Sequence, residues 1–383
     1  MSVVSALILS RRPASAFVVV GLFWGCFAAY VPVIKAQMDV NDAQFGTLLL
    51  GSAFGLVSSM FLAPRVDRLL GERGMQVAAV LLAFVWLFPA QITTPVVFFA
   101  VFVAVGLCSG LLDVIMNARV SELEGRTGRS LMNGNHAMFS VAYAIGALVV
   151  GAAREGGLDP LWVFGAMGIV TLLIATQLRM HVDTVEPADG IRGRYPLIPI
   201  LICGGIVLVA FMSEATVEAW SALHVERTLG GGAAEGALGP AMLGVTMAIG
   251  RFSGQVVSEK LREVSVTLWA SLISASGAIV AAFAPTPMVA YVGFGILGLG
   301  VSVIGPMGLA LVGKLVAPHH RTEAISKAAV MGFSGFFLAP VLMGYASEAF
   351  GLRVAFACVA LLLVTAVPLS LLAARLRATI KAG

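Results

Sequence analysis

The most regular feature of this sequence is a series of long apolar runs, each about 20 residues, separated by short polar segments. Apolar residues in these runs are continuous and do not alternate with polar ones, which favours helices over the strands of a membrane barrel. A helix needs roughly 20 apolar residues to cross a hydrocarbon core of ~30 Å. The pattern predicts twelve membrane-spanning helices, at residues 14–36, 42–63, 74–91, 95–118, 132–153, 159–179, 196–220, 237–258, 264–284, 287–314, 322–347 and 352–374.

One polar stretch, residues 181–194, is longer than the others and divides the spans into two groups of six. The two groups resemble each other, because a pair of acidic and basic neighbours follows the second span of each: Asp67–Arg68 and Glu259–Lys260. Parallel repeats of this kind are typical of transporters. We predict an all-α integral membrane protein with two pseudo-symmetric six-helix bundles, at residues 1–180 and 196–383, joined by a cytoplasmic linker at 181–195.

The composition excludes a soluble protein. Hydrophobic residues make up 59% of the 383 residues, charged residues only 11%, and the mean hydropathy is +0.97. Soluble chains carry roughly a quarter charged residues. Soluble enzymes, nucleic-acid binders and disordered scaffolds are therefore excluded together.

Lys and Arg are unevenly divided between the two sides of the predicted bundle. Twenty of the 24 fall on the side of the termini and the linker, among them Arg251 and Lys327 near helix ends. The other side carries only Lys35, Arg154, Arg227 and Arg353. Because positively charged loops stay in the cytoplasm, we predict a multi-pass protein of the bacterial inner membrane with both termini cytoplasmic.

Motifs for catalysis or cofactor binding do not fit their required contexts. The four cysteines lie far apart inside apolar runs, which predicts neither a disulfide framework nor a metal site. A GxGxxG pattern at 293–298 and an incomplete P-loop at 308–314 lie in an apolar span, where glycines serve helix packing. HExxH and GxSxG do not occur. We therefore expect no enzyme activity, no cofactor and no metal.

The polar segment after the second span carries a motif. Residues 63–74 read APRVDRLLGERG, and this segment resembles the G-x-x-x-D-R-x-G-R signature of the major facilitator superfamily. Asp67 and Arg68 match, Ala63 replaces the first Gly, and one extra Leu precedes Gly71. With twelve spans and the repeat, the resemblance covers nearly the whole chain. It implies that Asp67 contacts the start of span eleven, near residues 322–326, in the outward-facing state; a solvated loop ion pair is the alternative.

Ionisable side chains inside the spans are candidates for proton coupling, because a charge at the bilayer centre costs at least ~2.5 kcal/mol and usually marks a pathway. Asp113 and Asn117 are four residues apart and share a helix face, and His136 lies at a similar depth on the next span. These three predict a cytoplasmic gate or proton relay; a static hydrogen-bonded network is the alternative. Glu214 lies ~27 Å from the start of span seven and is predicted to exchange a proton for solute.

Further residues are candidates for the wall of a substrate cavity. Glu218 lies one turn beyond Glu214, with an interfacial position as its alternative. Aromatic rings and hydrogen-bonding groups near midspan suit a sugar or cyclitol ring, with a lipid-facing or core position as the alternative. These candidates are Trp24, Tyr30, Gln255, Ser302, Phe333, Ser334, Phe336 and Phe337.

The segments DVIMNA, HAMFSVAYAIGA and SEATVEAWSALHV resemble a bacterial branch of the superfamily related to the fucose permease, which includes proteins linked to rhizopine, an amino-inositol derivative. This resemblance implies proton-coupled transport of a sugar, polyol or amino-inositol. With Arg251 and Lys327 at helix ends, the acidic residues leave a negatively charged cavity, which favours an amine-bearing solute. We expect a monomeric secondary transporter whose partners are a small solute, protons and membrane lipids, without nucleic acid. Proton-driven efflux of a small or drug-like molecule is the alternative.

Overall fold

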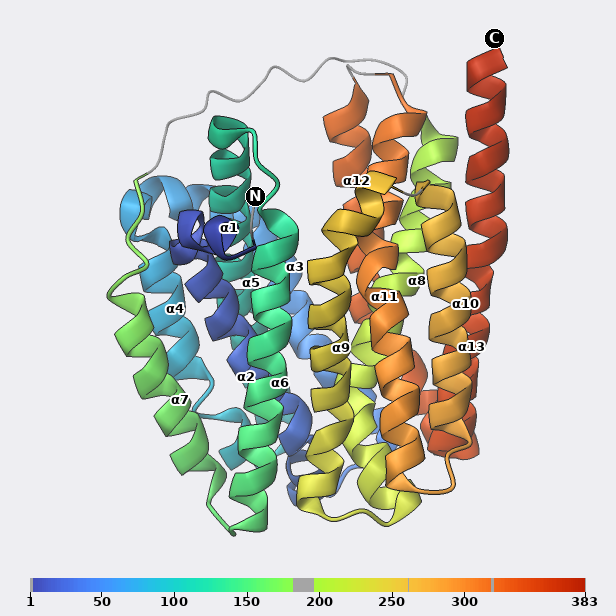
Figure 1. The fold of residues 1–383 in the computed structure, drawn as a ribbon. Coiled ribbons are helices and arrows are strands. Elements are labelled where there is room, and N and C mark those ends of the chain that lie inside the picture. The colour runs from blue at the N-terminus through green and yellow to red at the C-terminus, as the bar shows by residue number, and fades with distance from the viewer. Residues whose placement is uncertain (1–2, 182–195, 261, 318–319, 383) are drawn as a thin grey trace.

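The computed structural model describes residues 3–181, 196–260, 262–317 and 320–382, and these form helices and turns without any strand. The helices run side by side along one common direction (Figure 1). Both termini lie at one end, here called the terminal end, and the opposite end is called the distal end. The helices are α1 (Val3–Leu9), α2 (Arg11–Gln37), α3 (Asp42–Leu70), α4 (Gly74–Val85), α5 (Pro95–Thr127), α6 (Met132–Glu155), α7 (Pro160–Ala175), α8 (Leu197–Leu223), α9 (Ala233–Lys260), α10 (Glu263–Ala282), α11 (Pro287–Leu315), α12 (Arg321–Phe333) and α13 (Gly335–Ala382).

The predicted all-helical membrane fold is confirmed, and the described helices can be read as twelve crossings. Among the described residues, nine helical stretches are long and apolar enough to span a bilayer. Two of these, at 42–91 and 323–378, each hold two crossings, because the chain turns back at Gly71 and at Gly351, where φ is positive. The shorter apolar helix α7 is the remaining crossing.

Several helices extend beyond the predicted spans at the terminal end. Helix α3 continues through Pro64 to Leu70, so that Asp67 and Arg68 lie on its last two turns and not in a loop. Helix α5 continues to Thr127. Hydropathy marks only the part of a helix that lies in hydrocarbon. It therefore does not predict these polar helix ends.

Two predicted spans are interrupted in the structure. The span predicted at 74–91 ends as α4 at Val85 and is followed by a 3-10 turn, Pro89–Gln91. The span predicted at 322–347 is divided at Ser334 into α12 and the first part of α13. At this break Gly335 approaches the backbone of α8, and a Cβ there would lie 2.9 Å from the Leu208 carbonyl oxygen.

Local sequence explains where many of the helices begin. Asn41 and Gln44 form a capping box at the start of α3, in which the Asn41 side chain accepts from the Gln44 amide at 2.8 Å. Asp159 accepts from the Leu161 amide at 2.7 Å and caps α7. Helices α5, α7 and α11 have Pro in their first turn, where its missing amide hydrogen is not needed.

The first six crossings, α2 to α7, pack around an aromatic core, and α8 to α13 form the second half of the molecule. In the first half Trp86 stacks on Phe23 and on Phe164, with ring centroids 5.6 Å and 5.8 Å apart. Closely packed glycines bring α2 against α6, since a Cβ on Gly25 would collide with the Tyr143 backbone.

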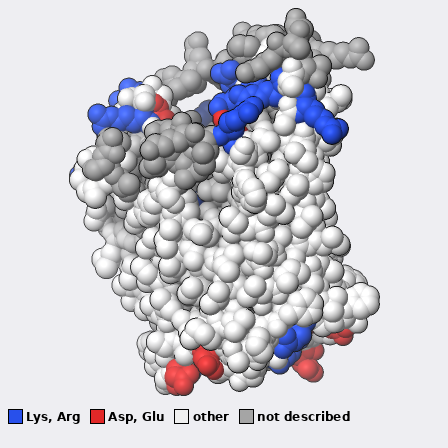
Figure 2. Space-filling model, turned by 45° about the vertical axis from the view of Figure 1, so that its right-hand side comes forward, with Lys and Arg blue, Asp and Glu red and all other residues white. Residues whose placement is uncertain are grey.

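The two halves meet mainly along two helix pairs, α3 with α13 and α6 with α9, and α2 also contacts α8. Near the distal end the first pair is very close, because a Cβ on Gly46 would collide with the carbonyl of Pro340. Away from this interface, large apolar side chains such as Leu69, Trp162 and Phe350 are exposed. Figure 2 shows a broad belt without charged side chains, with basic residues mainly at the terminal end. This surface fits a bilayer around the belt.

Candidate functional site

A cavity of about 650 Å³ lies between the two halves of the molecule. Helices α2, α3, α5 and α6 contribute one side of it, and α8, α9, α11, α12 and α13 contribute the other. It reaches Met132 and Asn133 at the terminal end of α6. Its wall is mainly apolar, with aromatic rings from both halves, and includes Asp113, Asn117, His136, Tyr143, Glu214, Glu218 and Arg251 as polar groups.

An ion pair between Arg251 and Glu214 crosses this cavity wall. The Arg251 Nη2 atom lies 3.0 Å from Glu214 Oε1, and both side chains are nearly buried. The other guanidinium nitrogen donates to the Ser140 hydroxyl and, at 3.3 Å, to the carbonyl oxygen of His136. Arg251 on α9 therefore joins α8 of its own half to α6 of the other half. The expectation that Arg251 lies at a helix end, away from the acids, is wrong, because its long side chain reaches into the cavity.

Asp113 and Asn117 share one face of α5, as their spacing predicts. The Asn117 side-chain nitrogen donates to Asp113 Oδ1 at 3.1 Å and to the Asp113 carbonyl oxygen at 2.8 Å. His136 lines the same cavity, and its ring makes an edge contact with Phe17 at 4.8 Å between centroids. In the described part of the chain, Asp113 and His136 form no side-chain hydrogen bond with each other, so a relay between them would need a bridging group.

The other predicted cavity residues divide into two groups. Trp24, Phe333 and Glu218 line the cavity. Three others are not among the residues that line it: Tyr30 packs on Phe164, Ser302 donates to the Leu299 carbonyl at 2.8 Å, and Phe337 packs on Phe54. Of the predicted residues Ser334, Phe336 and Phe337, Phe336 is the one that lines this cavity. The side chain of Gln255 is outside the described residues.

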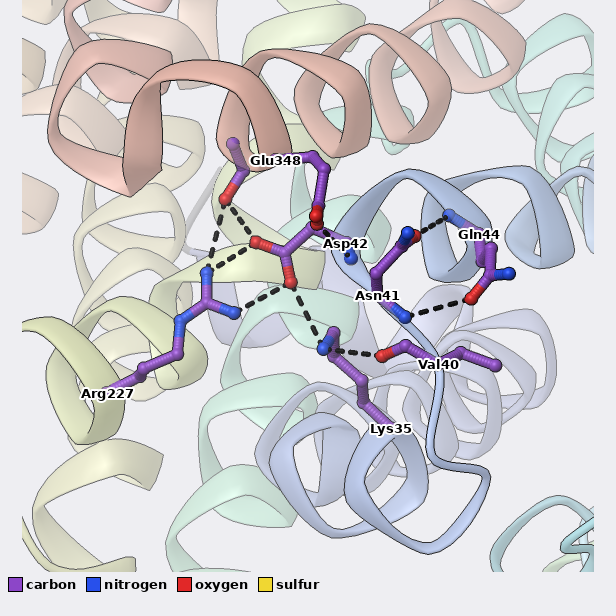
Figure 3. A network of polar contacts seen from close by, with 8 residues as sticks. Lys35, Val40, Asn41, Asp42, Gln44, Arg227 and Glu348 are labelled. Atoms are coloured by element: carbon purple, nitrogen blue, oxygen red, sulfur yellow. Dashed lines mark hydrogen bonds and ion pairs between the residues drawn. The ribbon is translucent and has the colours of Figure 1, made fainter.

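Polar contacts around Asp42 join the two halves at the distal end (Figure 3). These contacts, with Lys35, Arg227, Ser347 and Glu348, and the nearby Arg154–Glu226 ion pair are here called the distal clasp. Its centre is Asp42 at the start of α3, which is 2% exposed. The Arg227 Nη1 atom donates to Asp42 Oδ1 at 2.7 Å, Lys35 Nζ lies 3.1 Å from the same oxygen, and the Ser347 hydroxyl donates to Oδ2. The Asp42 amide donates to Glu348 at 2.9 Å. Asp42 thus connects the first half to two elements of the second half, the turn His224–Thr228 and helix α13.

In a second ion pair of the distal clasp the first half supplies the base and the second half the acid, the reverse of the Asp42–Arg227 pair. Arg154 of α6 donates to both oxygens of Glu226, at 2.6 Å and 2.9 Å, and to the Ala29 carbonyl at 2.7 Å. Glu226 and Arg227 are neighbours in one π-helical turn, His224–Thr228, that follows α8. This turn therefore presents one acid and one base, and each meets its opposite charge on the first half.

Ion pairs near the terminal end join helices of the same half. Arg119 is 2% exposed and lies 2.6 Å from Asp67 and 2.8 Å from Glu122. In the second half, Glu263 of α10 pairs with Lys314 of α11 and, at 3.2 Å, with Arg377 of α13. Charge thus links the halves at the distal end and stabilises each half separately near the terminal end.

Comparison with known proteins agrees with this architecture. The family model described as Major Facilitator Superfamily matches residues 14–260 and 202–381. The chain belongs to the major facilitator superfamily. It is therefore a multi-pass membrane transporter and not an enzyme.

Relatives within the major facilitator superfamily cover almost the whole chain. An uncharacterized MFS-type transporter of Yersinia pestis is 32% identical over 91% of this chain and 92% of its own length. The membrane protein MosC of Rhizobium meliloti is 27% identical over 88% of this chain and 83% of its own length.

Solved superfamily structures share the fold at low identity. A bacterial homologue of the human lysosomal transporter Spinster, in an inward-facing and occupied conformation, has a TM-score of 0.77 at 16% identity, covering 98% of both chains. A D-xylose–proton symporter has a TM-score of 0.71 at 16% identity, covering 96% of this chain and 97% of its own.

The signature segment of the superfamily takes one specific arrangement here. Asp67 pairs with Arg119, while Arg68 donates to the Pro64 carbonyl at 3.2 Å. Gly71 has φ +51° and ends α3. Contact of Asp67 with residues 322–326 is expected for the outward-facing state and stays a prediction.

Sequence reasoning missed Arg251 and Tyr143 as cavity residues, and it missed Ser140 as a hydrogen-bond partner of Arg251. For Arg251 a signal was present, because the residue falls inside the predicted span 237–258, where an unpaired charge is costly. For Ser140 and Tyr143 no local pattern marks the cavity face, since small and aromatic residues are equally suited to helix packing.

Proposed function

We propose that this transporter moves a small polar solute, a sugar, polyol or amino-inositol, across the bacterial inner membrane by alternating access coupled to protons. The observation that carries this proposal is the Arg251–Glu214 ion pair of the second half, which lies at the cavity while Arg251 also donates to Ser140 and the His136 carbonyl of the first half. Buried charges in a membrane are retained mainly for function. Fold likeness to the D-xylose–proton symporter supports a solute cavity between the halves but does not define the solute.

Alternating access is supported by the different chemistry of the two ends. The distal clasp holds the halves together at one end, while the cavity extends toward the other. The excess of Lys and Arg on the side of the termini favours a cytoplasmic location for that end. With this orientation the structure is inward-facing. We infer that residues 1–180 and 196–383 rotate as two units of a monomer, surrounded by lipid.

Proton coupling follows from the chemistry of Glu214. A proton on this carboxyl removes its negative charge and with it the Coulomb attraction to Arg251, which is strong in a site with little water. Arg251 is then held only by Ser140 and His136 on the opposite half. Asp113, whose partner is Asn117, is the second candidate for the transported proton.

The test is transport into proteoliposomes with an imposed pH gradient. Labelled glucose, myo-inositol and glucosamine serve as probes, in the wild type and in Glu214→Gln and Asp113→Asn. We expect one variant to lose uphill uptake and keep exchange of solute across the membrane, which also shows that it is folded. Asp39→Asn, an exposed loop carboxylate with positive φ that Asn tolerates, is the control. Undiminished uphill uptake in both variants would remove these residues from the coupling mechanism.

Efflux of a lipophilic molecule is the second candidate, because most of the cavity wall is apolar. Trp24, Phe27, Phe102, Phe211 and Phe333 all face the cavity. Aromatic surfaces of this kind bind flat or lipophilic cations. Proton-driven expulsion of tetraphenylphosphonium from loaded vesicles, without transport of the polar probes, would favour this second function.

A further inference from the structure

Glu218 is an acid in the cavity wall that forms no direct hydrogen bond or ion pair with any described residue. It lies on α8, one turn beyond Glu214, and lines the same cavity. Among the residues that the structure describes, it has no hydrogen-bond donor and no ion-pair partner, whereas Glu214 is paired with Arg251 at 3.0 Å. The two neighbouring carboxylates therefore differ: one is satisfied by the protein and the other is available.

Tyr143 provides a second unsatisfied polar group at this place. Its side chain lines the cavity from α6, and its residue is 2% exposed. The hydroxyl has no hydrogen-bond partner within the described ranges, and it interacts electrostatically with Glu218 and Glu214. A buried hydroxyl without a partner keeps its capacity to donate or accept a hydrogen bond, so Tyr143 can contact a solute here.

The side chains that line the cavity carry a net negative charge. The charged groups that line it are the carboxylates Asp113, Glu214 and Glu218 and the guanidinium of Arg251, with His136 as a further titratable group. Three acids thus face one base when His136 is neutral. An uncompensated carboxylate in a site of low dielectric is costly, so that a cation is preferred there over a neutral or anionic group.

We propose that Glu218 is the counter-ion of a protonated amine on the transported solute, with the Tyr143 hydroxyl as a second contact. The proposal rests on the proposed function and narrows the solute to an amine-bearing polyol or sugar. The ammonium nitrogen donates to the carboxylate and accepts nothing, while the aromatic rings of the wall contact the face of the sugar or cyclitol ring.

Pairing with an amine also excludes a proton from Glu218. A carboxyl group that carries a proton has no charge to offer an ammonium ion, so that binding of the amine displaces any proton held there. A charge-assisted hydrogen bond of this kind corresponds to about 10-fold to 100-fold in affinity.

The experiment measures binding of matched probes to the purified full-length protein by thermal shift and titration calorimetry. Glucosamine, glucose and N-acetylglucosamine share one ring, and only the first carries a charged amine. We expect glucosamine to bind about 10-fold or more tightly than the other two. In Glu218→Gln this preference is lost, in Glu218→Asp it is largely kept, and Glu235→Gln, a carboxylate on α9 outside the cavity wall, is the matched control.

The possible outcomes separate this inference from the function on which it rests. Equal binding of glucose and glucosamine, or a preference that persists in Glu218→Gln, overturns the assignment of Glu218 and leaves a polar-solute transporter standing. Binding of tetraphenylphosphonium alone, with no response to any of the three sugars, contradicts both.

Discussion

At the scale of single residues, Arg251 connects more parts of the site than any predicted residue does. It pairs with Glu214 on α8 and contacts Ser140 and the His136 carbonyl on α6. Both members of the pair are nearly buried, so each depends on the other for its charge to be tolerated.

Removing one member of this pair is expected to destabilise the protein more than removing both. Glu214→Leu leaves Arg251 uncompensated, and breaking a buried pair in this way costs about 3–5 kcal/mol. The double variant Glu214→Leu with Arg251→Met leaves no buried charge behind. We expect its thermal midpoint in detergent to lie above that of either single variant. A double variant less stable than both would show that the pair itself stabilises the fold.

The sequence predicts part of this site and not the rest, for a physical reason. Asp113 and Asn117 could be paired because their contact is local and follows from helical spacing. Arg251 and Glu214 lie on different helices, 37 residues apart, and their contact depends on how α8 and α9 pack. The same holds for Tyr30, Ser302 and Phe337, since their depth was predictable but their direction around the helix axis was not.

At the scale of elements, the π-helical turn His224–Thr228 forms the distal clasp with the first half. Glu226 meets Arg154 and Arg227 meets Asp42, so the two contacts have opposite polarity. Because each charge meets its opposite only in one placement, the two ion pairs favour one relative position of the halves at the distal end.

Exchange of the two charges is expected to restore the clasp. Arg154→Glu or Glu226→Arg alone places like charges together and should open the distal end, whereas the two changes combined re-form an ion pair. The readout is the rate at which a membrane-impermeant maleimide, added at the distal face, labels Leu49→Cys in a background without native cysteines. We expect labelling about tenfold faster in each single variant, which corresponds to ~1.4 kcal/mol in the free energy of opening the distal end. In the double variant we expect a labelling rate near that of the wild type. Equal rates in all three variants would exclude the clasp as a gate.

Hydropathy identified the elements because the bilayer imposes a length on every apolar helix. It did not identify where α3 and α5 end, since their polar final turns lie beyond the hydrocarbon. Nor did it reveal the break at Ser334, where the approach of Gly335 to the α8 backbone belongs to tertiary packing. The π-helical turn carries no sequence signal that distinguishes it from the end of an ordinary helix.

At the scale of the whole molecule, the two halves meet around one cavity and are held together by charges at the distal end. Close approach of Gly46 to Pro340 adds a steric contact to the clasp. In such a structure the distal end is closed and the cavity extends toward the terminal end. Rotation of the halves about the cavity would exchange the two ends, as alternating access requires.

The most direct test of this account is a pair of distances measured together by double electron–electron resonance in lipid nanodiscs. One pair of spin labels, at Glu155 and Ala349, reports on the distal end, and another, at Thr127 and Ala378, reports on the terminal end; all four positions are exposed. Asp42→Asn combined with Glu226→Gln weakens both contacts of the clasp. The account predicts that the distal distance then increases while the terminal distance decreases. Two distances that stay constant, or that change in the same direction, would contradict it.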